Sequence, residues 1–408
     1  MYRKYKEPDF MPTRSQMQEI IREKIKPIAQ TELIPFFEGQ GRILAEDVFS
    51  IHELPNMPAS RMDGIGVHFA DFTTGIPDTS SWKEGREYVF CNTGVAIPEG
   101  FDTVIMIENV DFYHGILSIH QRPEKRGECV NPPGDHMKKG ERLVTEGMLI
   151  TPAHVGLFAS GGVERILVLK RPIVAIIPTG NELVAPGAYV PKGKNVESNS
   201  YMLAAYITMW GACPLQYPIA LDHPETLLEI LRKAIDESDM VIVIAGSSKG
   251  SEDYTMDVLG KLGDMLVHEL AHGPGKHSSL TLVGEKPVVG VAGPPFGAQT
   301  FAELYLQQMI RALSGQPKPE DMLLEVVLDD EFVKHEVDFC ERVHVCHTRD
   351  GYHAQAVLSR GGTRVSMVNS VNANLYRPAG SFYPAGSHAQ VDLLCPLEYI
   401  GNTVKDEK

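Results

Sequence analysis

Apolar and polar positions follow different patterns in different parts of this 408-residue chain. Between Arg171 and Gly315, short β-branched apolar runs alternate with amphipathic stretches of helical length. Strands separated by helices are typical of a mainly parallel, doubly wound α/β sheet. The expected strands are Ile173–Ile177, Pro214–Ile219, Met240–Ile244, Met265–Leu270 and Pro287–Val291, and the expected helices are Ser200–Trp210, Pro224–Glu237, Tyr254–Gly263 and Gly297–Leu313.

The first 170 residues have a different texture. Apolar positions at helical spacing predict helices over Arg14–Ala29 and Leu33–Ala45, and Thr151–Leu169 returns to a helix followed by a short strand. From Met57 to Leu149 the apolar runs are short and are separated by Gly, Pro and Asp, which is typical of a small antiparallel β domain. We therefore expect a β domain inserted into one elongated N-terminal module.

The end of the chain is again rich in strand-like runs, which follow a linker containing Pro317 and Pro319. These runs predict a small β barrel or sandwich; they are Leu323–Leu328, Glu341–His347, His353–Leu358 and Gln390–Leu394. We thus expect a multidomain α/β protein with β domains. Its domains are residues 1–50 with 150–170 (the N-terminal module), 51–149 (the inserted β domain), 171–315 (the α/β domain) and 316–408 (a C-terminal β-barrel domain).

Composition and charge narrow the function. The net charge of −15 argues against general nucleic-acid binding, which needs a basic face, although a local cluster of N–H groups and one lysine can still hold an anion. No apolar run is long enough for a membrane span, and the N-terminus lacks the apolar core of a secretory signal. A cytoplasmic protein that binds small molecules is therefore expected.

The six cysteines are scattered without a CxxC pair, which favours reduced thiols over a disulfide framework or a zinc site. Cys340 and Cys346, with His344 and His347, form the one cluster of soft ligands in the sequence. Alternation along FCERVHVCH puts both cysteines on one face of a strand and His347 on the other. A structural strand is expected there rather than a metal site.

Acidic residues follow three of the expected strands. Glu182, Asp222 and Asp253 lie on loops after the first, second and third strands, at the carboxyl edge where α/β sheets bind ligands. Each alone could simply cap the next helix. Three carboxylates at one edge need a cation or shifted pKa values, and hard oxygen ligands fit Mg²⁺ bridging to a phosphate.

Glycines and cations on the neighbouring loops fit the same ligand. Gly180, Gly246 and Gly250 would let a phosphate approach the backbone closely. The loop His272–His277 adds Lys276 on a glycine-proline turn, and Gly290–Gly297 leads from the last strand into the last helix. Together, the loops predict binding of a phosphorylated or oxyanionic ligand with Mg²⁺.

Seven motifs extend this picture over nearly the whole chain. They are SRMDGIGV (Ser60–Val67), NTGVAIPEGFDTVIMIE (Asn92–Glu108), PPGDHMKKGERL (Pro132–Leu143), PTGNEL (Pro178–Leu183), ESNS (Glu197–Ser200), GSEDYT (Gly250–Thr255) and PGK (Pro274–Lys276). In sequence and order they resemble the molybdopterin molybdenumtransferases, the family that includes the bacterial molybdenum-inserting enzyme and the gephyrin E domain.

The resemblance implies an α/β domain of the molybdopterin-binding type and a homodimer of four-domain subunits, with possible contacts to other molybdenum-cofactor proteins. It implies Mg²⁺-dependent insertion of molybdate, or tungstate, into adenylylated molybdopterin with release of AMP. The implied catalytic residues are Asp253, Glu182, Asp222, Asp63 and Lys276, with Asp253 and Glu182 near Mg²⁺ and Asp63 reaching in from the second subunit. The implied binding residues are Thr93, Asp135, Ser198, Asn199 and Arg342, of which Arg342, like Lys276, stands on the molybdate side. The loop residues Gly180, Gly246, Ser248, Lys249 and Gly250 are further expected binding residues.

The chain departs from the family at the molybdate-side loops. Its AGSSKG is one glycine shorter and adds Lys249, Gly273 replaces the first lysine of K-P-G-K, and Ala292 and Gly297 replace a proline and a serine. Lys249 could restore the lost charge, because a lysine on a neighbouring loop supplies an equivalent point charge. Besides a working transferase, two alternatives stay open: a carrier that binds molybdopterin or its nucleotide without inserting metal, and a dimeric scaffold.

Overall fold

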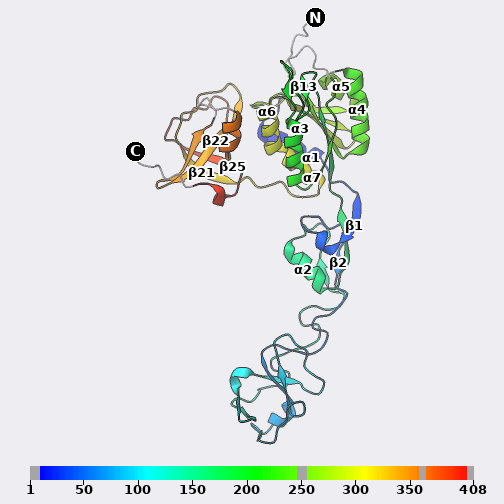
Figure 1. Cartoon of the computed structure of the whole chain (residues 1–408), viewed down its shortest axis with the longest axis vertical. Helices are drawn as coiled ribbons and strands as arrows, with labels where there is room; N and C mark the ends of the chain where they lie inside the picture. The colour runs from blue at the N-terminus through cyan, green and yellow to red at the C-terminus, as the bar shows by residue number, and fades with distance from the viewer. Residues whose placement is uncertain (1–9, 222, 246–254, 358–363, 402–408) are drawn as a thin grey trace. The chain divides into compact units, whose positions relative to one another are not determined.

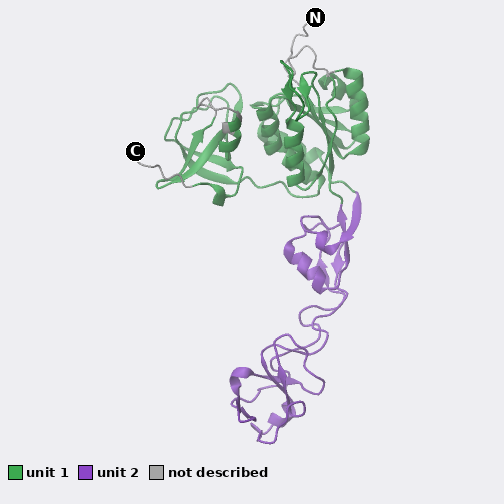
Figure 2. Cartoon of the chain, viewed as in Figure 1, with its two compact units in different colours: residues 1–29, 170–408 green, residues 30–169 purple. Residues whose placement is uncertain are grey.

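In the computed structural model, residues 10–221, 223–245, 255–357 and 364–401 are described. The chain divides into two compact units, each described here by itself (Figure 2). Unit 1 contains residues 1–29 and 170–408, and unit 2 contains residues 30–169. None of the described helices combines the length and apolar character that a membrane span requires.

The larger part of unit 1 is the expected α/β domain (Figure 1). Its six-stranded sheet has the order β15-β12-β16-β20-β19-β17, in which the first four strands are parallel. These strands are β12 (Ile173–Pro178), β15 (Cys213–Gln216), β16 (Met240–Ala245), β17 (Asp264–Val267), β19 (Ser279–Val283) and β20 (Lys286–Ala292). The prediction of a mainly parallel, doubly wound sheet is confirmed.

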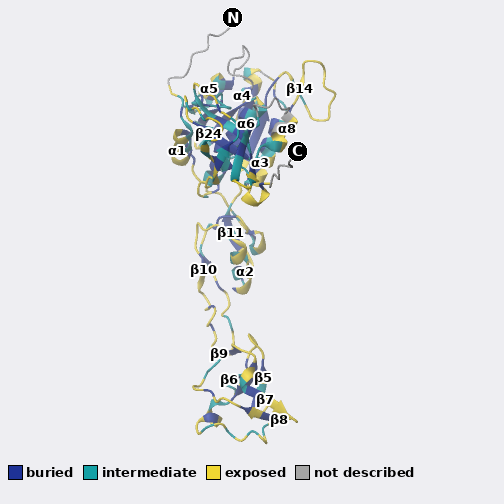
Figure 3. Ribbon diagram, turned by 90° about the vertical axis from the view of Figure 1, so that its left-hand side faces the viewer, coloured by how far each residue is buried: buried dark blue, intermediate teal, exposed yellow. Residues whose placement is uncertain are grey.

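Both faces of this sheet are buried, which explains the continuous apolar runs of its strands (Figure 3). Val174 and Ile176 point into one core, and Ala175 and Ile177 point into the other. The first core is covered by α3 (Asn199–Met209), α6 (Pro295–Phe301), the π-helical turn η4 (Ala302–Leu306) and α7 (Gln307–Leu313). The second is covered by α4 (Pro224–Glu237) and α5 (Thr255–Leu262).

Two details of this domain differ from the sequence prediction. Strand β19 was not predicted; it pairs antiparallel with β20 through the tight turn at Gly284. Helix α1 (Arg14–Lys24) was assigned to an N-terminal module, but its apolar side, Met17 and Ile21, completes the α/β core. The Ile28 N–H also donates to the Leu313 carbonyl at 2.9 Å, which fixes the chain after α1 to the end of α7.

Unit 2 contains the expected β structure but differs from the prediction in one segment. The predicted helix over Leu33–Ala45 is wrong: β1 (Thr31–Pro35) pairs antiparallel with β11 (Arg165–Leu169), followed by a single 3-10 turn, η1 (Phe36–Glu38). Helix α2 (Pro152–Ser160) packs onto the hydrophobic core formed by β1 and β11, which contains Ile34 and Ile166. Its other strands are β2 (Val48–Phe49), β3 (Ala59–Ser60), β4 (Gly64–Val67), β5 (Tyr88–Cys91), β6 (Thr103–Met106), β7 (Val110–Tyr113), β8 (Ile116–Ile119), β9 (Val130–Asn131) and β10 (Arg142–Val144), with short turns η2 (Phe69–Phe72) and η3 (Ile107–Asn109).

The C-terminal part of unit 1 is a closed five-stranded barrel, as predicted. Its strands follow one another as β22-β23-β21-β25-β24, and β24 pairs back with β22. They are β21 (Leu323–Leu328), β22 (Asp338–Thr348), β23 (Gly351–Ala356), β24 (Ala373–Arg377) and β25 (His388–Leu393), with helix α8 (Arg364–Ser370) and a final turn η6 (Leu397–Tyr399). The segment FCERVHVCH lies within β22, so the predicted strand is confirmed. Cys340 and Cys346 are buried in it.

Candidate functional site

Loops from separate strands meet at the carboxyl edge of the α/β sheet. After β12, Thr179 N–H donates to Ile244 O at 2.9 Å, and Gly180 N–H donates to Ala220 O at 3.1 Å. The loop after β12 is therefore bonded both to the end of β16 and to the segment after β15. This is the edge at which the sequence placed the ligand.

Gly180 and Glu182 form one local structure on this edge. Gly180 has a φ of +152°, and a Cβ on it would lie 2.8 Å from each carboxylate oxygen of Glu182. The carboxylate of Glu182 thus folds back over the backbone of Gly180, while the residue as a whole remains exposed. The bare backbone of Gly180 allows this hard oxygen donor to occupy the end of β12.

A carboxylate binds the start of α3. Ser198 is the N-cap residue, but its side chain makes no capping bond to the helix. Glu197 does this instead: its buried carboxylate accepts the Ser200 N–H at 2.8 Å and the Ser200 hydroxyl at 2.6 Å. A carboxylate at a helix N-terminus is favoured by the helix dipole. The negative charge at this helix end therefore comes from the chain itself.

Asn199 joins α3 to the last loop of the edge. Its Nδ2 donates to Gly293 O at 2.7 Å, while its buried Oδ1 has no partner in the described part of the chain. Gly293 precedes α6, so the start of α3 and the start of α6 are bonded together. Asn199 was predicted as a binding residue, and it stands where two of the predicted loops meet.

Lys276 lies beside a buried carboxylate that the sequence prediction missed. Its Nζ is 3.9 Å from Glu269, and the Nδ1 of His277 is 2.7 Å from the same carboxylate. The Glu269 side chain is almost fully buried, whereas that of Lys276 is 24% exposed. The positive charge of Lys276 is therefore shared with Glu269 rather than offered entirely to a ligand.

The two glycine departures have structural partners. A Cβ at Gly273 would lie 3.0 Å from the ring of Phe339, a barrel residue. A Cβ at Gly297 would lie 3.3 Å from the Cα of Gly275 and 3.3 Å from the Cβ of Ala292. Neither position has room for the family's longer side chain unless its neighbours move.

Arg342 is occupied by another side chain. Its Nη1 donates to Glu303 in a very short ion pair and to Asn374 Oδ1 at 3.1 Å, and its Nη2 donates to Thr300 Oγ1 at 3.1 Å. The side chains of Arg342 and Glu303 are only 2% and 6% exposed. The structure therefore gives the predicted molybdate-side cation a carboxylate partner inside the protein.

Unit 2 brings together two of its predicted site residues and places the third nearby. Thr93 donates to Asp63 Oδ1 from its N–H at 2.7 Å and from its hydroxyl at 3.0 Å. The backbone N–H of Thr93, followed by its hydroxyl, lowers the pKa of Asp63. Asp135 forms an ion pair at 3.6 Å with Arg61, two residues before Asp63. Asp63 is therefore held as an exposed carboxylate, ready to interact with a cation or a donor.

The other predicted site residues lie outside the described residues. They are Asp222, Gly246, Ser248, Lys249, Gly250 and Asp253.

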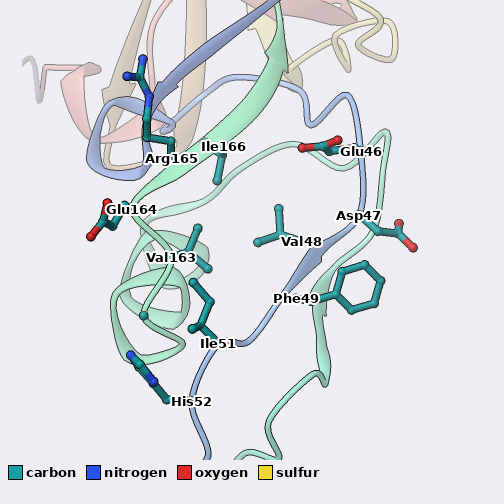
Figure 4. A pocket seen from close by; sticks show the side chains of 11 residues that line it. Glu46, Asp47, Val48, Phe49, Ile51, His52, Val163, Glu164, Arg165 and Ile166 are labelled. Carbon is teal, nitrogen blue, oxygen red and sulfur yellow. The ribbon is translucent and has the colours of Figure 1, made fainter.

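A cavity of about 590 Å³ lies in unit 2 (Figure 4). The segments 46–52 and 162–166 line it, with Val48, Val163 and Ile166 as its apolar floor. The edge of the α/β sheet is assigned as the candidate site because of its converging loops, not because of cavity size.

Several residues that shape the site were not predicted. Glu197 is the first residue of the ESNS motif. The signal that could have identified it is an acidic residue directly before the start of a helix. Glu269 and Glu303 carry no comparable signal, because their partners come from other segments. Glu303 in particular pairs with a residue 39 positions later in the chain.

Two family models match most of the chain. The MoeA N-terminal region (domain I and II) matches residues 13–162, and the probable molybdopterin binding domain matches residues 175–312. These matches cover most of unit 2 and most of the α/β domain, including the loops of the sheet edge.

Relatives extend the similarity to the full length. The molybdopterin molybdenumtransferase of Bacillus subtilis is 26% identical over 388 residues, covering 90% of each chain. That of Nostoc is 27% identical over 400 residues, covering 92% of this chain and 91% of the relative. A crystal structure of the molybdopterin biosynthesis moea protein from Pyrococcus horikosii superposes with a TM-score of 0.75 at 24% identity, covering 95% of this chain and 100% of that one. This structural likeness supports the fold, barrel included.

Proposed function

The chain belongs to the molybdopterin molybdenumtransferase family, a family of transferases of molybdenum cofactor biosynthesis, and from this premise we propose that it inserts molybdate or tungstate into adenylylated molybdopterin and releases AMP. The observation that carries the proposal is the convergence of the loops at Gly180, Asn199 and Gly293 on one sheet edge. Ligands of open α/β sheets bind at this edge.

The exposed carboxylate of Glu182 fits a role at Mg²⁺. Its hard oxygens lie at the end of β12, in space that a side chain on Gly180 would occupy. Mg²⁺ usually takes one or two protein carboxylates and completes its shell with water and substrate phosphates. Glu182 and Asp253 would hold it, and when bound it would neutralise charge on the pyrophosphate that is cleaved.

The remaining residues would bind and orient the substrates. Asn199 lies where α3 meets the last loop, so it would order the loops around the pterin nucleotide. Lys276 would attract the oxyanion, with its charge moderated by Glu269. Lys249, which the family lacks, would add a second cation and so replace the charge lost at Gly273.

Measurement of AMP release tests the proposal. Glu182→Gln keeps the shape of the side chain but removes its charge, so we expect AMP release from adenylylated molybdopterin to fall roughly 10²-fold. Asp253→Ala should abolish it. Glu229→Gln, at an exposed position in α4, is the matched control and should release AMP at the wild-type rate.

The outcomes separate the function from its alternative. If the wild-type protein binds the pterin nucleotide but neither molybdate nor tungstate, even with Mg²⁺, a carrier role replaces insertion. If both carboxylate variants turn over like the wild type, the assignment of the catalytic edge is wrong.

We further propose that the protein acts as a homodimer in which Asp63 of one subunit serves the site of the other. Asp63 is oriented by Thr93 in unit 2, whereas Glu182 belongs to unit 1. Mixing inactive Asp63→Ala and Glu182→Ala chains should restore part of the AMP release, because hybrid dimers contain one intact site. No recovery after verified subunit exchange would argue against a shared site.

A further inference from the structure

The C-terminal barrel touches the α/β domain at the loop that carries Lys276. Within that loop, the short strand β18 (His272–Gly273) pairs in parallel with the first residues of β22, so the loop extends the barrel sheet. The ring of Phe339 also lies against the bare backbone of Gly273. The position of this loop therefore depends on where the barrel sits.

A buried ion pair fixes the barrel a few residues further along β22. Arg342 of β22 and Asn374 of β24 both donate to Glu303 Oε2, the latter at 3.2 Å. Thr300 accepts from the second Nη of Arg342, so one guanidinium spans a full helical turn of the α/β domain. Two domains are thereby joined through one carboxylate with almost no exposure to water.

The other oxygen of Glu303 is held from the α/β side. Tyr206 of α3 donates to Oε1 at 2.9 Å, and Gln299 of α6 donates to the same oxygen at 3.0 Å. Burial, with the adjacent Glu303, raises the pKa of Tyr206, so its hydroxyl stays protonated as a donor. Glu303 itself lies in the π-helical turn η4, an irregularity often found at functional positions.

We infer that Glu303 and Arg342 are positioning residues, which dock the barrel and thereby set the Lys276 loop, and that Arg342 does not itself bind the oxyanion. Each carboxylate oxygen of Glu303 accepts hydrogen bonds from side chains of the protein itself. Arg342 therefore has a carboxylate partner within the protein in the place where a ligand would bind. The inference rests on the proposed function only for the identity of the oxyanion. The mechanical link between the ion pair and the loop is independent of it.

The rival explanation makes Glu303 a plug that occupies an anion-binding Arg342. The two explanations predict opposite signs for Glu303→Gln. If Arg342 were the ligand, removal of the competing charge would tighten molybdate binding. If the pair positions the loop, Glu303→Gln leaves a buried guanidinium unpaired, loosens the docking and weakens molybdate binding.

The experiment is a double-mutant cycle with Glu303→Gln, Arg342→Gln and the two combined. Each single variant should bind molybdate about tenfold more weakly in calorimetry while its pterin-nucleotide affinity stays unchanged. The combined variant removes both buried charges, so it should recover to within about threefold of the wild type. Recovery is not possible if Arg342 is a ligand.

Hydrogen exchange supplies a readout that does not depend on activity. Backbone amides of residues 268–277 should exchange about tenfold faster in Glu303→Gln than in the wild type, and the combined variant should restore protection. Glu229→Gln is the matched control and should change neither exchange nor binding. If Arg342→Gln does not fold, Glu303→Gln still decides by the sign of its effect.

Three results would overturn the inference: tighter molybdate binding by Glu303→Gln, unchanged exchange in 268–277, or a combined variant as weak as Arg342→Gln. A wild-type protein that binds no oxyanion, but whose exchange responds as expected, would instead refute the proposed function and leave the positioning role intact.

Discussion

Gly180→Ala is the smallest change that disturbs the proposed catalytic edge. Gly180 follows the buried strand β12, and its φ of +152° lies in a region that L-residues rarely adopt. The new methyl group would also stand 2.8 Å from both carboxylate oxygens of Glu182. The substitution therefore combines backbone strain with displacement of a functional side chain.

The two effects differ in size and in kind. A non-glycine residue in a sparsely populated backbone region costs about 1–3 kcal/mol. A loss of about 2 kcal/mol lowers the Tm of a domain of this size by roughly 4–8 °C. The carboxylate clash adds little to this cost, because Glu182 is exposed and its flexible end can move away. Its consequence is functional: the carboxylate leaves the position proposed for Mg²⁺.

Gly187→Ala is the matched control. Gly187 also has a positive φ, +80°, but a Cβ there would meet no atom within 4 Å. The Tm of thermal unfolding should therefore be lower in both variants than in the wild type. AMP release at saturating Mg²⁺ should fall about 10²-fold only in Gly180→Ala. Wild-type AMP release and Mg²⁺ dependence in Gly180→Ala would refute the link between this glycine and the placement of Glu182.

Two further predictions concern the loop of Lys276 and its neighbour. Gly297→Ser should destabilise the protein by about 1–3 kcal/mol in thermal unfolding, because its Cβ would crowd Gly275, whereas Gly260→Ala in α5, with its nearest neighbour atom at 3.7 Å, should not. Burial lowers the pKa of His272 to about 4, so the folded protein keeps it neutral where the unfolded chain, at a pKa near 6.5, binds a proton. Above about pH 6.5 His272 is neutral in both states and does not affect the free energy of unfolding. This free energy should fall by about 3 kcal/mol as the pH decreases towards 4. The Tm of His272→Gln, measured over this range, should depend less on pH than that of the wild type.

Local sequence patterns predicted the secondary structure correctly where an element buries one regular apolar face. Helix α4 was predicted with its observed ends, Pro224 and Glu237, because proline at the first turn and a regular apolar stripe mark it clearly. The segment Leu33–Ala45 misled for the same reason. Its apolar residues are compatible with helical spacing, but pairing of β1 with β11, more than a hundred residues later, determines the structure.

The candidate site was predictable to the level of loops. The carboxyl edge follows from the order of strands and helices, and the contact of Asp63 with Thr93 agrees with two motifs assigned to one site. The partners of Lys276 and Arg342 were not predictable. Glu269 and Glu303 carry no motif, and whether a nearby charge is neutralised depends on packing between segments that are distant in sequence.

The glycine departures are best explained as one packing arrangement rather than as separate losses. Gly273 has no side chain where the Phe339 ring lies, and Gly297 has none where Gly275 approaches. Both contacts hold the Lys276 loop, one from the barrel and one from the start of α6. A lysine returned at Gly273 would have to displace Phe339, and so would loosen the docking of the barrel that the Glu303–Arg342 pair maintains. In this chain the barrel therefore provides a contact that fixes the loop where the family carries a charge. Under the proposed function, attraction for the oxyanion would then depend on Lys276.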